Sequence, residues 1–247
     1  MTQPNAAARP VLSVVVPVKN EQGNIAPLVA EIAAAVFSLG AYEVIYVNDG
    51  STDGTADAIE SLRASRPWLR HIRHDRSTGQ SAAVRTGVRY ARADVVCTLD
   101  GDGQNDPAFI PALYRALDDA GATTGLAQGQ RVGRKDTAFK KLQSRIANKV
   151  RGAILKDGTR DTGCGLKCFR REAYLALPYF DALHRFMPAL MVREGYRVVH
   201  VDVVDRPRLT GTSNYGFLNR AFVGILDLTG VWWLRRRRKP SPTATEA

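Results

Sequence analysis

The acidic segment LDGDGQNDP at residues 99–107 has the clearest chemical potential in the sequence. Asp100 and Asp102 are separated by a single glycine and follow an apolar stretch that predicts a buried strand. Carboxylates this close repel each other unless a cation neutralises them, and Mg²⁺ or Mn²⁺ prefers such oxygen ligands. Gln104 adds a neutral oxygen in the same turn. Helix-capping turns use the same residue types, so the pair predicts a metal site only if the fold places it at a ligand-binding edge.

A second group of polar residues follows two other apolar stretches. Pro17 and Glu21 lie in VVVPVKNE, and Asp49 and Ser51 lie in VNDGSTDGT. If both stretches are parallel strands, their exits share one edge of the sheet. Acceptors at that edge could bind the base N–H groups and ribose hydroxyls of a nucleoside. Tight turns use the same residues, so each segment taken alone predicts a turn.

The spacing of apolar residues predicts alternating strands and helices in the front half of the chain. Continuous β-branched runs are typical of strands buried on both faces, and apolar residues at helical spacing are typical of amphipathic helices. Repeated β-α units predict an α/β fold with a doubly wound, mostly parallel sheet flanked by helices. The predicted strands span 11–18, 42–50, 69–73 and 93–103, and the predicted helices span 22–37, 53–65, 79–92 and 107–120.

The back half of the chain is less regular. It contains two amphipathic segments rich in apolar residues and cations, which predict C-terminal amphipathic helices, and one alternating segment that predicts a half-buried strand. The second helix ends in Trp232 and Trp233 and is followed by a run of cations. The segments are a helix at 137–155, a strand at 197–204, a helix at 215–234 and the cation run at 235–239.

The charge of the chain is divided unevenly. The net charge is +11, but residues 1–125 contain 11 Lys and Arg against 14 Asp and Glu, whereas residues 126–247 contain 24 against 10. A basic back half predicts a polyanionic partner such as a phosphorylated substrate or an anionic lipid surface. No nucleic-acid module accompanies the basic run, so a nucleic-acid partner is not expected. The absence of GxGxxG and GxxxxGK[ST] argues against a dinucleotide oxidoreductase and a P-loop NTPase.

Seven short segments follow one another in a specific order: PVKNE, NDGSTDGT, STGQSAAVRTG, LDGDGQNDP, DTGCGLKCFRRE, HRFMPAL and RPRLTGTSNYG. They belong to a resemblance that covers nearly the whole chain, about residues 11–234. The series resembles the dolichyl-phosphate mannosyltransferase and bacterial polyprenyl-phosphate glycosyltransferase group of family-2 glycosyltransferases. This resemblance implies a GT-A fold and a metal-dependent, inverting transfer of a hexose from GDP-mannose or a UDP-sugar to a polyprenyl phosphate.

The resemblance also implies roles for the matching positions. The positions that match the nucleotide site are Pro17, Glu21, Asn48, Asp49, Ser51, Gly79, Gln80 and Asp100. The positions that match the Mg²⁺ or Mn²⁺ site are Asp100, Asp102 and Gln104. The positions that match the site for the acceptor phosphate are Arg131, Lys140, Ser144, Arg208 and Ser213. The resemblance assigns the catalytic roles to Asp100, Asp102, Asp161 and Arg208.

Two departures from the family pattern and three alternative functions remain at this point. Asn48 stands where the family frequently has aspartate, and Lys140 where it often has arginine, which would bind a phosphate in bidentate fashion. The same fold could use a glycan acceptor, or the chain could be a catalytically silent nucleotide-binding membrane adaptor. A sugar nucleotidyltransferase would need a Gly-rich basic loop after the first strand, and VPVKNEQGN supplies only Lys19 and one glycine.

The expected organisation follows from these segments. No run of roughly 18 apolar residues occurs, so no transmembrane helix is expected. The apolar stretch 221–234 is interrupted by Asp227 and suits an interfacial position, with tryptophans at headgroup depth and arginines on anionic lipid. We therefore expect a peripheral protein on the cytoplasmic face of the membrane. The predicted parts are a flexible N-terminus at 1–10, a GT-A catalytic domain at 11–213, an interfacial helix with its basic run at 214–239 and a disordered tail at 240–247.

Overall fold

The computed structural model describes residues 9–133, 148–207 and 217–239, with the backbone alone for 217–222. Several sequence-based predictions therefore lie outside the described residues. They include Lys140, Ser144, Arg208 and Ser213, most of the helix predicted at 137–155, and nearly all of the predicted terminal segments. Residues 148–155 at the end of that predicted helix are helical.

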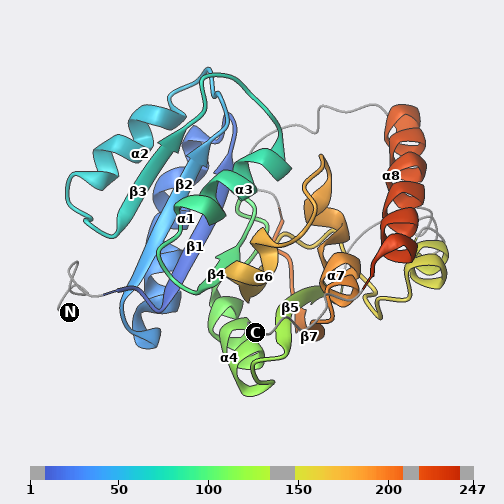
Figure 1. Cartoon of the computed structure of the whole chain (residues 1–247). Helices are drawn as coiled ribbons and strands as arrows, with labels where there is room; N and C mark the ends of the chain where they lie inside the picture. Colours follow the sequence, from blue (N-terminus) through green and yellow to red (C-terminus); the bar gives the residue numbers. More distant parts are fainter. Residues whose placement is uncertain (1–8, 134–147, 208–216, 240–247) are drawn as a thin grey trace, which may run out of the picture.

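A seven-stranded sheet forms the centre of the molecule, in the order β3-β2-β1-β4-β6-β5-β7 (Figure 1). All strands run parallel except β6, which is antiparallel to both β4 and β5. The predicted α/β class and mostly parallel sheet are thus confirmed. The strands are β1 (Leu12–Val18), β2 (Tyr42–Asn48), β3 (Leu69–Arg73), β4 (Val95–Thr98), β5 (Thr124–Arg131), β6 (Lys167–Arg170) and β7 (Arg197–Val203).

Helices cover both faces of this sheet. The core cluster on one face receives α1, α2 and α4, and the cluster on the other receives α3, α6 and α7. In β1, Val14 and Val16 belong to the first cluster and Val15 to the second, which explains why the strand is apolar at nearly every position. The helices are α1 (Gln22–Val36), α2 (Thr55–Arg63), α3 (Gln80–Tyr90), α4 (Ile110–Asp119), α6 (Arg171–Leu175), α7 (Leu183–Arg193) and α8 (Phe217–Arg237), with 3₁₀ turns at Phe37–Leu39 and Pro107–Phe109.

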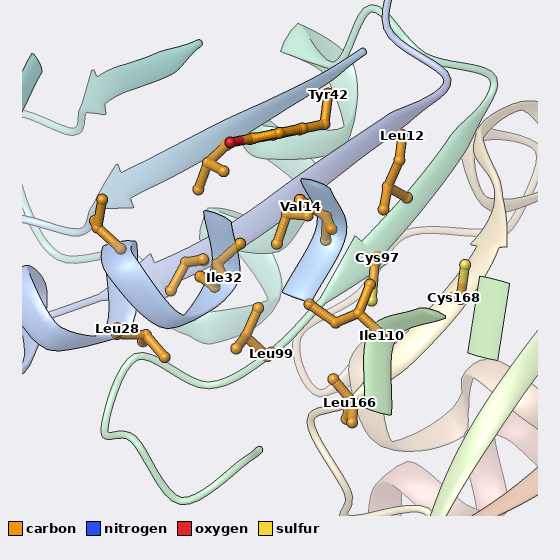
Figure 2. Packing of buried hydrophobic residues seen from close by; sticks show 14 of the residues in the cluster. Leu12, Val14, Leu28, Ile32, Tyr42, Cys97, Leu99, Ile110, Leu166 and Cys168 are labelled. Carbon is orange, nitrogen blue, oxygen red and sulfur yellow. The ribbon is translucent and has the colours of Figure 1, made fainter. Parts of the chain in front are cut away.

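The first core cluster packs α1 and α4 against the middle of the sheet. Figure 2 shows Leu28 and Ile32 of α1 and Ile110 of α4 meeting the side chains of β1 and β4. By length and composition, the segment Gln22–Leu39 is the one part of the described chain that could also cross a membrane. Its apolar side chains Ile25, Leu28, Val29, Ile32 and Val36 are nevertheless buried in this cluster, as those of a core helix would be.

Two strands were not predicted from the sequence, and both belong to the second half of the sheet. β5 reads TGLAQGQR and is buried along almost its whole length, although it contains two glycines and two glutamines. The glycines leave space for neighbours, because a Cβ atom on Gly125 would lie 2.8 Å from Tyr196 and one on Gly129 would lie 2.7 Å from the Leu166 carbonyl oxygen. The composition of β5 therefore reflects the close approach of neighbouring segments of the same chain. A pattern of apolar residues does not reveal such an approach.

The C-terminal helix α8 lies at the edge of the molecule beside α7 (Figure 1). Val231 is buried, and Arg193 of α7 donates a hydrogen bond of 3.0 Å from Nε to the Leu234 carbonyl oxygen. The apolar side chains on the rest of the helix are exposed, among them Val223, Ile225, Leu226 and Trp233. The helix is therefore anchored to α7 by one face and presents apolar side chains on another.

Replacing Gly87 with alanine tests the contact between α3 and the sheet. A Cβ atom at this position would lie 2.3 Å from Cγ1 of Val15, so overpacking should lower the free energy of unfolding by about 1–3 kcal/mol. Urea denaturation followed by circular dichroism measures the loss. Gly230→Ala is the matched control, because its Cβ would meet nothing within 4 Å on α8 and helix propensity alone favours alanine. Equal behaviour of the two variants would contradict the close packing of α3.

Candidate active site

The ends of β1, β2 and β4 meet at one edge of the sheet, as parallel strands require. A cleft of about 380 Å³ opens there. It is bounded by the strand exits, by the loop that precedes α3 and by the turn that follows β4. Seven of the positions predicted for nucleotide or metal binding line this cleft: Pro17, Glu21, Asp49, Gly79, Gln80, Asp100 and Asp102.

Side-chain hydrogen bonds connect the loop after β1 to the loop after β2. Asn20 adopts a left-handed conformation, with φ of 57°, and its Oδ1 accepts a hydrogen bond of 2.8 Å from the Thr52 N–H. Its own N–H donates to Oγ of Ser51, and the Ser51 N–H donates to Oδ1 of Asn48. Asn48 is buried, and in this structure the side chains of Asn48 and Ser51 form hydrogen bonds within the turn. Asp49, which lies between them in sequence, lines the cleft.

Asp49 is the most heavily hydrogen-bonded carboxylate of the cleft. It accepts from Nδ1 of His74 at 2.7 Å, from Oγ of Ser77 at 2.8 Å, and from the N–H groups of Thr78 and Gly79 at 2.9 Å each. Burial by itself would raise the pKa of this carboxyl, but the donors outweigh burial and lower the pKa to about 2. Asp49 therefore fixes the loop 77–79 against the end of β2.

Asp100 and Asp102 form the acidic end of the cleft. Oδ1 of Asp100 accepts a hydrogen bond of 2.7 Å from Nε2 of Gln80, and Oδ1 of Asp102 accepts one of 3.1 Å from the Gln104 N–H. Burial and then the negative charge of Asp102 raise the pKa of Asp100 to about 6. A Cβ atom on Gly165 would lie 2.3 Å from Oδ2 of Asp100, so the carboxyl is held tightly in place. The fold thus holds the carboxyl groups of Asp100 and Asp102 close together, which disfavours the ionised form of Asp100.

The two carboxylates fit a divalent cation. They offer hard oxygen ligands, and a cation would relieve both the burial of the Asp100 charge and its repulsion by Asp102, which together raise the Asp100 pKa. Within the described residues no group of three or more His, Cys, Asp or Glu side chains could form a closed metal site. A cation bound here would therefore need further oxygens from a ligand in the cleft, as the phosphates of a nucleotide could supply.

A second cavity of about 240 Å³ lies on the other side of Asp100. It shares Pro17, Gln80 and Asp100 with the cleft, so these three residues separate the two spaces. Its remaining polar lining comes from the other half of the sheet and includes Lys167 of β6 and His184 and Arg185 of α7. The structure thus extends the site from the first cleft towards β6 and α7. The sequence did not predict this second cavity.

Arg131, at the end of β5, is held by two carboxylates. Its Nε and Nη2 donate to Asp161 at 2.6 and 2.9 Å, and its Nη1 donates to Asp205 at 3.3 Å. A Cβ atom on Gly163 would lie 3.1 Å from Nη2 of Arg131, and Gly163 lines the second cavity. The structure therefore brings the predicted residues Arg131 and Asp161 together, directly behind the wall of that cavity.

Lys167 is the site residue that sequence reasoning missed. It is the first residue of β6, in the segment GLKCFRRE, and is 2% exposed, which is unusual for a lysine. A cation at the first position of a short apolar strand is the one signal that could have identified it. His184 was part of a matching segment but had no assigned role, and its Nδ1 lies 2.7 Å from Oγ of the buried Ser81.

Replacing Asp49 with asparagine tests the clamp on the loop 77–79. The carboxyl has a lowered pKa in the folded protein, so its charge stabilises the fold above the unfolded pKa near 4, and this stabilisation is lost as the pH falls towards 2. At pH 7 the variant should lose roughly 2 kcal/mol of unfolding free energy, and at pH 3 roughly half as much. Urea denaturation at both pH values measures the difference. A loss independent of pH would show that the charge of Asp49 is not what holds the loop.

Comparison with known proteins agrees with this geometry. The sequence model of glycosyl transferase family 2 matches residues 13–177. Dodecaprenyl-phosphate galacturonate synthase from Rhizobium johnstonii is 37% identical over 235 residues, which cover 93% of this chain and 69% of that protein. Undecaprenyl-phosphate 4-deoxy-4-formamido-L-arabinose transferase from Shewanella sediminis is 31% identical over 210 residues, covering 84% of this chain and 62% of that protein. The chain thus spans about two thirds of the length of these relatives.

Solved structures share the fold. A mannosyltransferase from Pyrobaculum calidifontis, in complex with GDP-Man and Mn²⁺, superposes with a TM-score of 0.68 at 22% identity, over 97% of this chain and 68% of that chain. Glucosyl-3-phosphoglycerate synthase from Mycobacterium tuberculosis, in complex with Mn²⁺ and UDP, gives a TM-score of 0.67 at 18% identity, over 93% of this chain and 81% of that chain. These matches confirm the GT-A architecture expected from the sequence. With the family model covering most of the sheet and the cleft, the chain belongs to glycosyl transferase family 2.

Proposed function

We propose that this glycosyltransferase moves a sugar from a nucleotide-sugar to a polyprenyl phosphate, with inversion at the anomeric carbon. Relatives that share 31–37% of its sequence are named for transfer to dodecaprenyl or undecaprenyl phosphate. Those names include galacturonate and formamido-arabinose, so the donor sugar need not be a neutral hexose. The observation that supports the proposal best is the position of Asp100 between the nucleotide-sized cleft and the second cavity.

The cleft provides for the nucleotide. Asp49 and Glu21 line one end, where a base and ribose present N–H and hydroxyl donors, and Asp100 and Asp102 line the other. A diphosphate at the acidic end would be repelled by the carboxylates unless a divalent cation lay between them. We assign Asp100 and Asp102 to hold Mg²⁺ or Mn²⁺, with Gln104 in the same turn. When bound, the cation would neutralise the departing diphosphate.

The acceptor requires positioning more than activation. A phosphate monoester has its second pKa near 6, so its oxygens are largely ionised at neutral pH and need no general base. One phosphate oxygen forms the new bond to the anomeric carbon while the bond to the nucleotide diphosphate breaks on the opposite face. Arg131 is next to the second cavity but is engaged by Asp161 and Asp205. In the proposed reaction the acceptor phosphate takes the place of one of these carboxylates on Arg131.

The remaining acceptor contacts are proposed from the sequence resemblance. Lys140, Ser144, Arg208 and Ser213 lie outside the described residues, in two segments that adjoin residues of the site. The first segment follows β5, which ends at Arg131, and the second follows Asp205, a partner of Arg131. These sequence neighbours, Arg131 and Asp205, are what supports the acceptor role proposed for both segments.

Replacing Asp102 with asparagine tests the metal assignment. The substitution keeps the side-chain volume but removes a ligand charge, so transfer should fall at least about hundredfold, since even outer-shell partners of metals are worth 10–100-fold. The measurement is transfer of radiolabel from a panel of UDP- and GDP-sugars to undecaprenyl phosphate in the presence of Mn²⁺. Asp118→Asn, which removes an exposed carboxylate from α4, is the control and should retain full activity. Full activity of the Asp102 variant would refute the metal role.

We further propose that α8 rests on the cytoplasmic surface of an anionic membrane, where a polyprenyl phosphate would be available. Trp233 is 55% exposed and apolar neighbours extend along the helix. The guanidinium of Arg236 lies 4.4 Å from the ring centroid of Trp232, and that of Arg237 lies 5.9 Å from that of Trp233. Aromatic rings beside cations suit the boundary between lipid tails and anionic headgroups.

Neutralising Arg236 and Arg237 with glutamine tests the membrane proposal. Each cation near an anionic surface contributes about 1 kcal/mol, so the double variant should bind vesicles of phosphatidylglycerol and phosphatidylcholine roughly 30-fold more weakly at low salt. Vesicle sedimentation measures the partitioning. Arg89→Gln, which removes an exposed cation from α3, is the control and should bind as the parent does. Binding that does not respond to the double variant or to salt would exclude an electrostatic attachment through α8.

A further inference from the structure

The second cavity contains more positive than negative charge. Lys167 and Arg185 line it, and Asp100 is the one acidic lining residue in the described part of the chain. In the proposed function, the charge of Asp100 is taken up by the divalent cation. His184, which also lines the cavity, is neutral, because burial and then the charges of Lys167 and Arg185 lower its pKa to about 3. Two cations are therefore left facing a space that a ligand must fill.

Lys167 is the less easily explained of the two cations. Its Nζ donates to the carbonyl oxygens of Cys164 and Thr162, and within the described residues it forms no ion pair with a carboxylate. A buried ammonium without an anionic partner is costly, and natural proteins normally pair it. The nearby Asp161 is already engaged in two hydrogen bonds with Arg131. The charges of Asp100 and Asp161 favour the protonated form of Lys167, but among the described residues neither carboxylate forms an ion pair with it.

The other polar groups of the cavity have partners of their own. Oγ1 of Thr98 donates to the Gly165 carbonyl oxygen at 2.9 Å, and Nδ1 of His184 is hydrogen-bonded to Ser81 at 2.7 Å. Nε2 of Gln80 donates to Asp100 at 2.7 Å. Lys167 and Arg185 are therefore the groups best placed to meet an anion, one from β6 and one from α7.

The position of the cavity indicates which part of a ligand enters it. It meets the nucleotide cleft at Asp100, where the diphosphate of the donor would lie. The group attached to that diphosphate is the transferred sugar. A cavity of about 240 Å³ is large enough for one sugar ring. An anionic partner for Lys167 and Arg185 would therefore be a group on the sugar.

We propose that the second cavity is the donor-sugar pocket and that it selects a sugar bearing a carboxylate, a uronic acid, through Lys167 and Arg185. This inference rests on the proposed function and specifies its donor. A neutral hexose would leave Lys167 buried with carbonyl partners alone, whereas a uronate carboxylate would neutralise it and accept a charge-assisted hydrogen bond. His184 and Ser81, both uncharged, suit the hydroxyl groups of the same ring.

Calorimetric titration of the full chain in Mn²⁺ tests this inference without any substitution. Each uronate is compared with the hexose that differs from it only at C6: UDP-galacturonate with UDP-galactose, and UDP-glucuronate with UDP-glucose. UDP and GDP alone report the nucleotide cleft. At least one uronate should bind about tenfold more tightly than its hexose, as expected for a hydrogen bond between charged groups. Equal or weaker binding of both uronates would overturn the inference.

Two variants locate the source of the preference. Lys167→Met keeps the length of the side chain and removes its charge, so it should abolish the preference while UDP binding changes less than about twofold. Loss of UDP affinity to the same extent would reassign Lys167 to the diphosphate and overturn the inference. If Lys167→Met does not fold, Arg185→Gln decides instead, because Arg185 is exposed. It should reduce the preference about threefold, with Arg89→Gln as the charge-matched control, and an unchanged preference would count against the pocket.

The titrations also separate the two proposals. If neither UDP nor GDP binds in the presence of Mn²⁺, the nucleotide-sugar function fails, and the sugar assignment fails with it. If a nucleotide binds in a Mn²⁺-dependent manner but both uronates behave as their hexoses do, the glycosyltransferase proposal stands and only the uronate pocket is lost.

Discussion

The repulsion between Asp100 and Asp102 is the constraint on which the rest of the site depends. The packing of Gly165 against Asp100 restricts the movement of this carboxyl, and both Asp100 and Asp102 are half-buried. Their low exposure weakens the screening of the pair by water. The fold thereby maintains a local excess of negative charge at the edge of its sheet. A ligand that brings a cation and phosphate oxygens to this point would neutralise that excess. The two carboxylates that destabilise the protein without a ligand would thus favour binding of the ligand.

Several of the cations in the basic half of the chain form ion pairs within the protein. Its excess of cations predicted a polyanionic partner, yet several of these cations are neutralised within the protein. Arg206 bonds to Glu31 and Asp106 at 2.6 Å each, and so links the back half to α1 and to the turn after β4. Arg131 is held by Asp161 and Asp205. Among the described cations without such partners, Lys167 and Arg185 line the second cavity, and Arg236 and Arg237 lie at the end of α8.

Much of the front half could be predicted from the sequence because it obeys simple patterns. β1 and β2 are buried on both faces, so they read as continuous apolar runs, and the residues at their exits must share an edge once the strands are parallel. β5 and β6 escaped prediction because glycine, glutamine and lysine occupy buried positions there. Lys167 was missed for the same reason: composition cannot reveal a cation that only the folded chain buries. The roles of Lys140 and Arg208 still rest on resemblance.

The antiparallel direction of β6 has a consequence for how such a site can change. β5 runs parallel to β4 and ends at the ligand-binding edge, and β6, which runs the opposite way, starts from that same edge. The whole connection from 132 to 166 therefore leaves and re-enters the sheet beside the cavity. Its last residues contact both halves of the site, because Asp161 pairs with Arg131 at the end of β5 and Gly165 packs against Asp100. A change in that part of the connection would therefore alter the second cavity and the acidic edge of the sheet together.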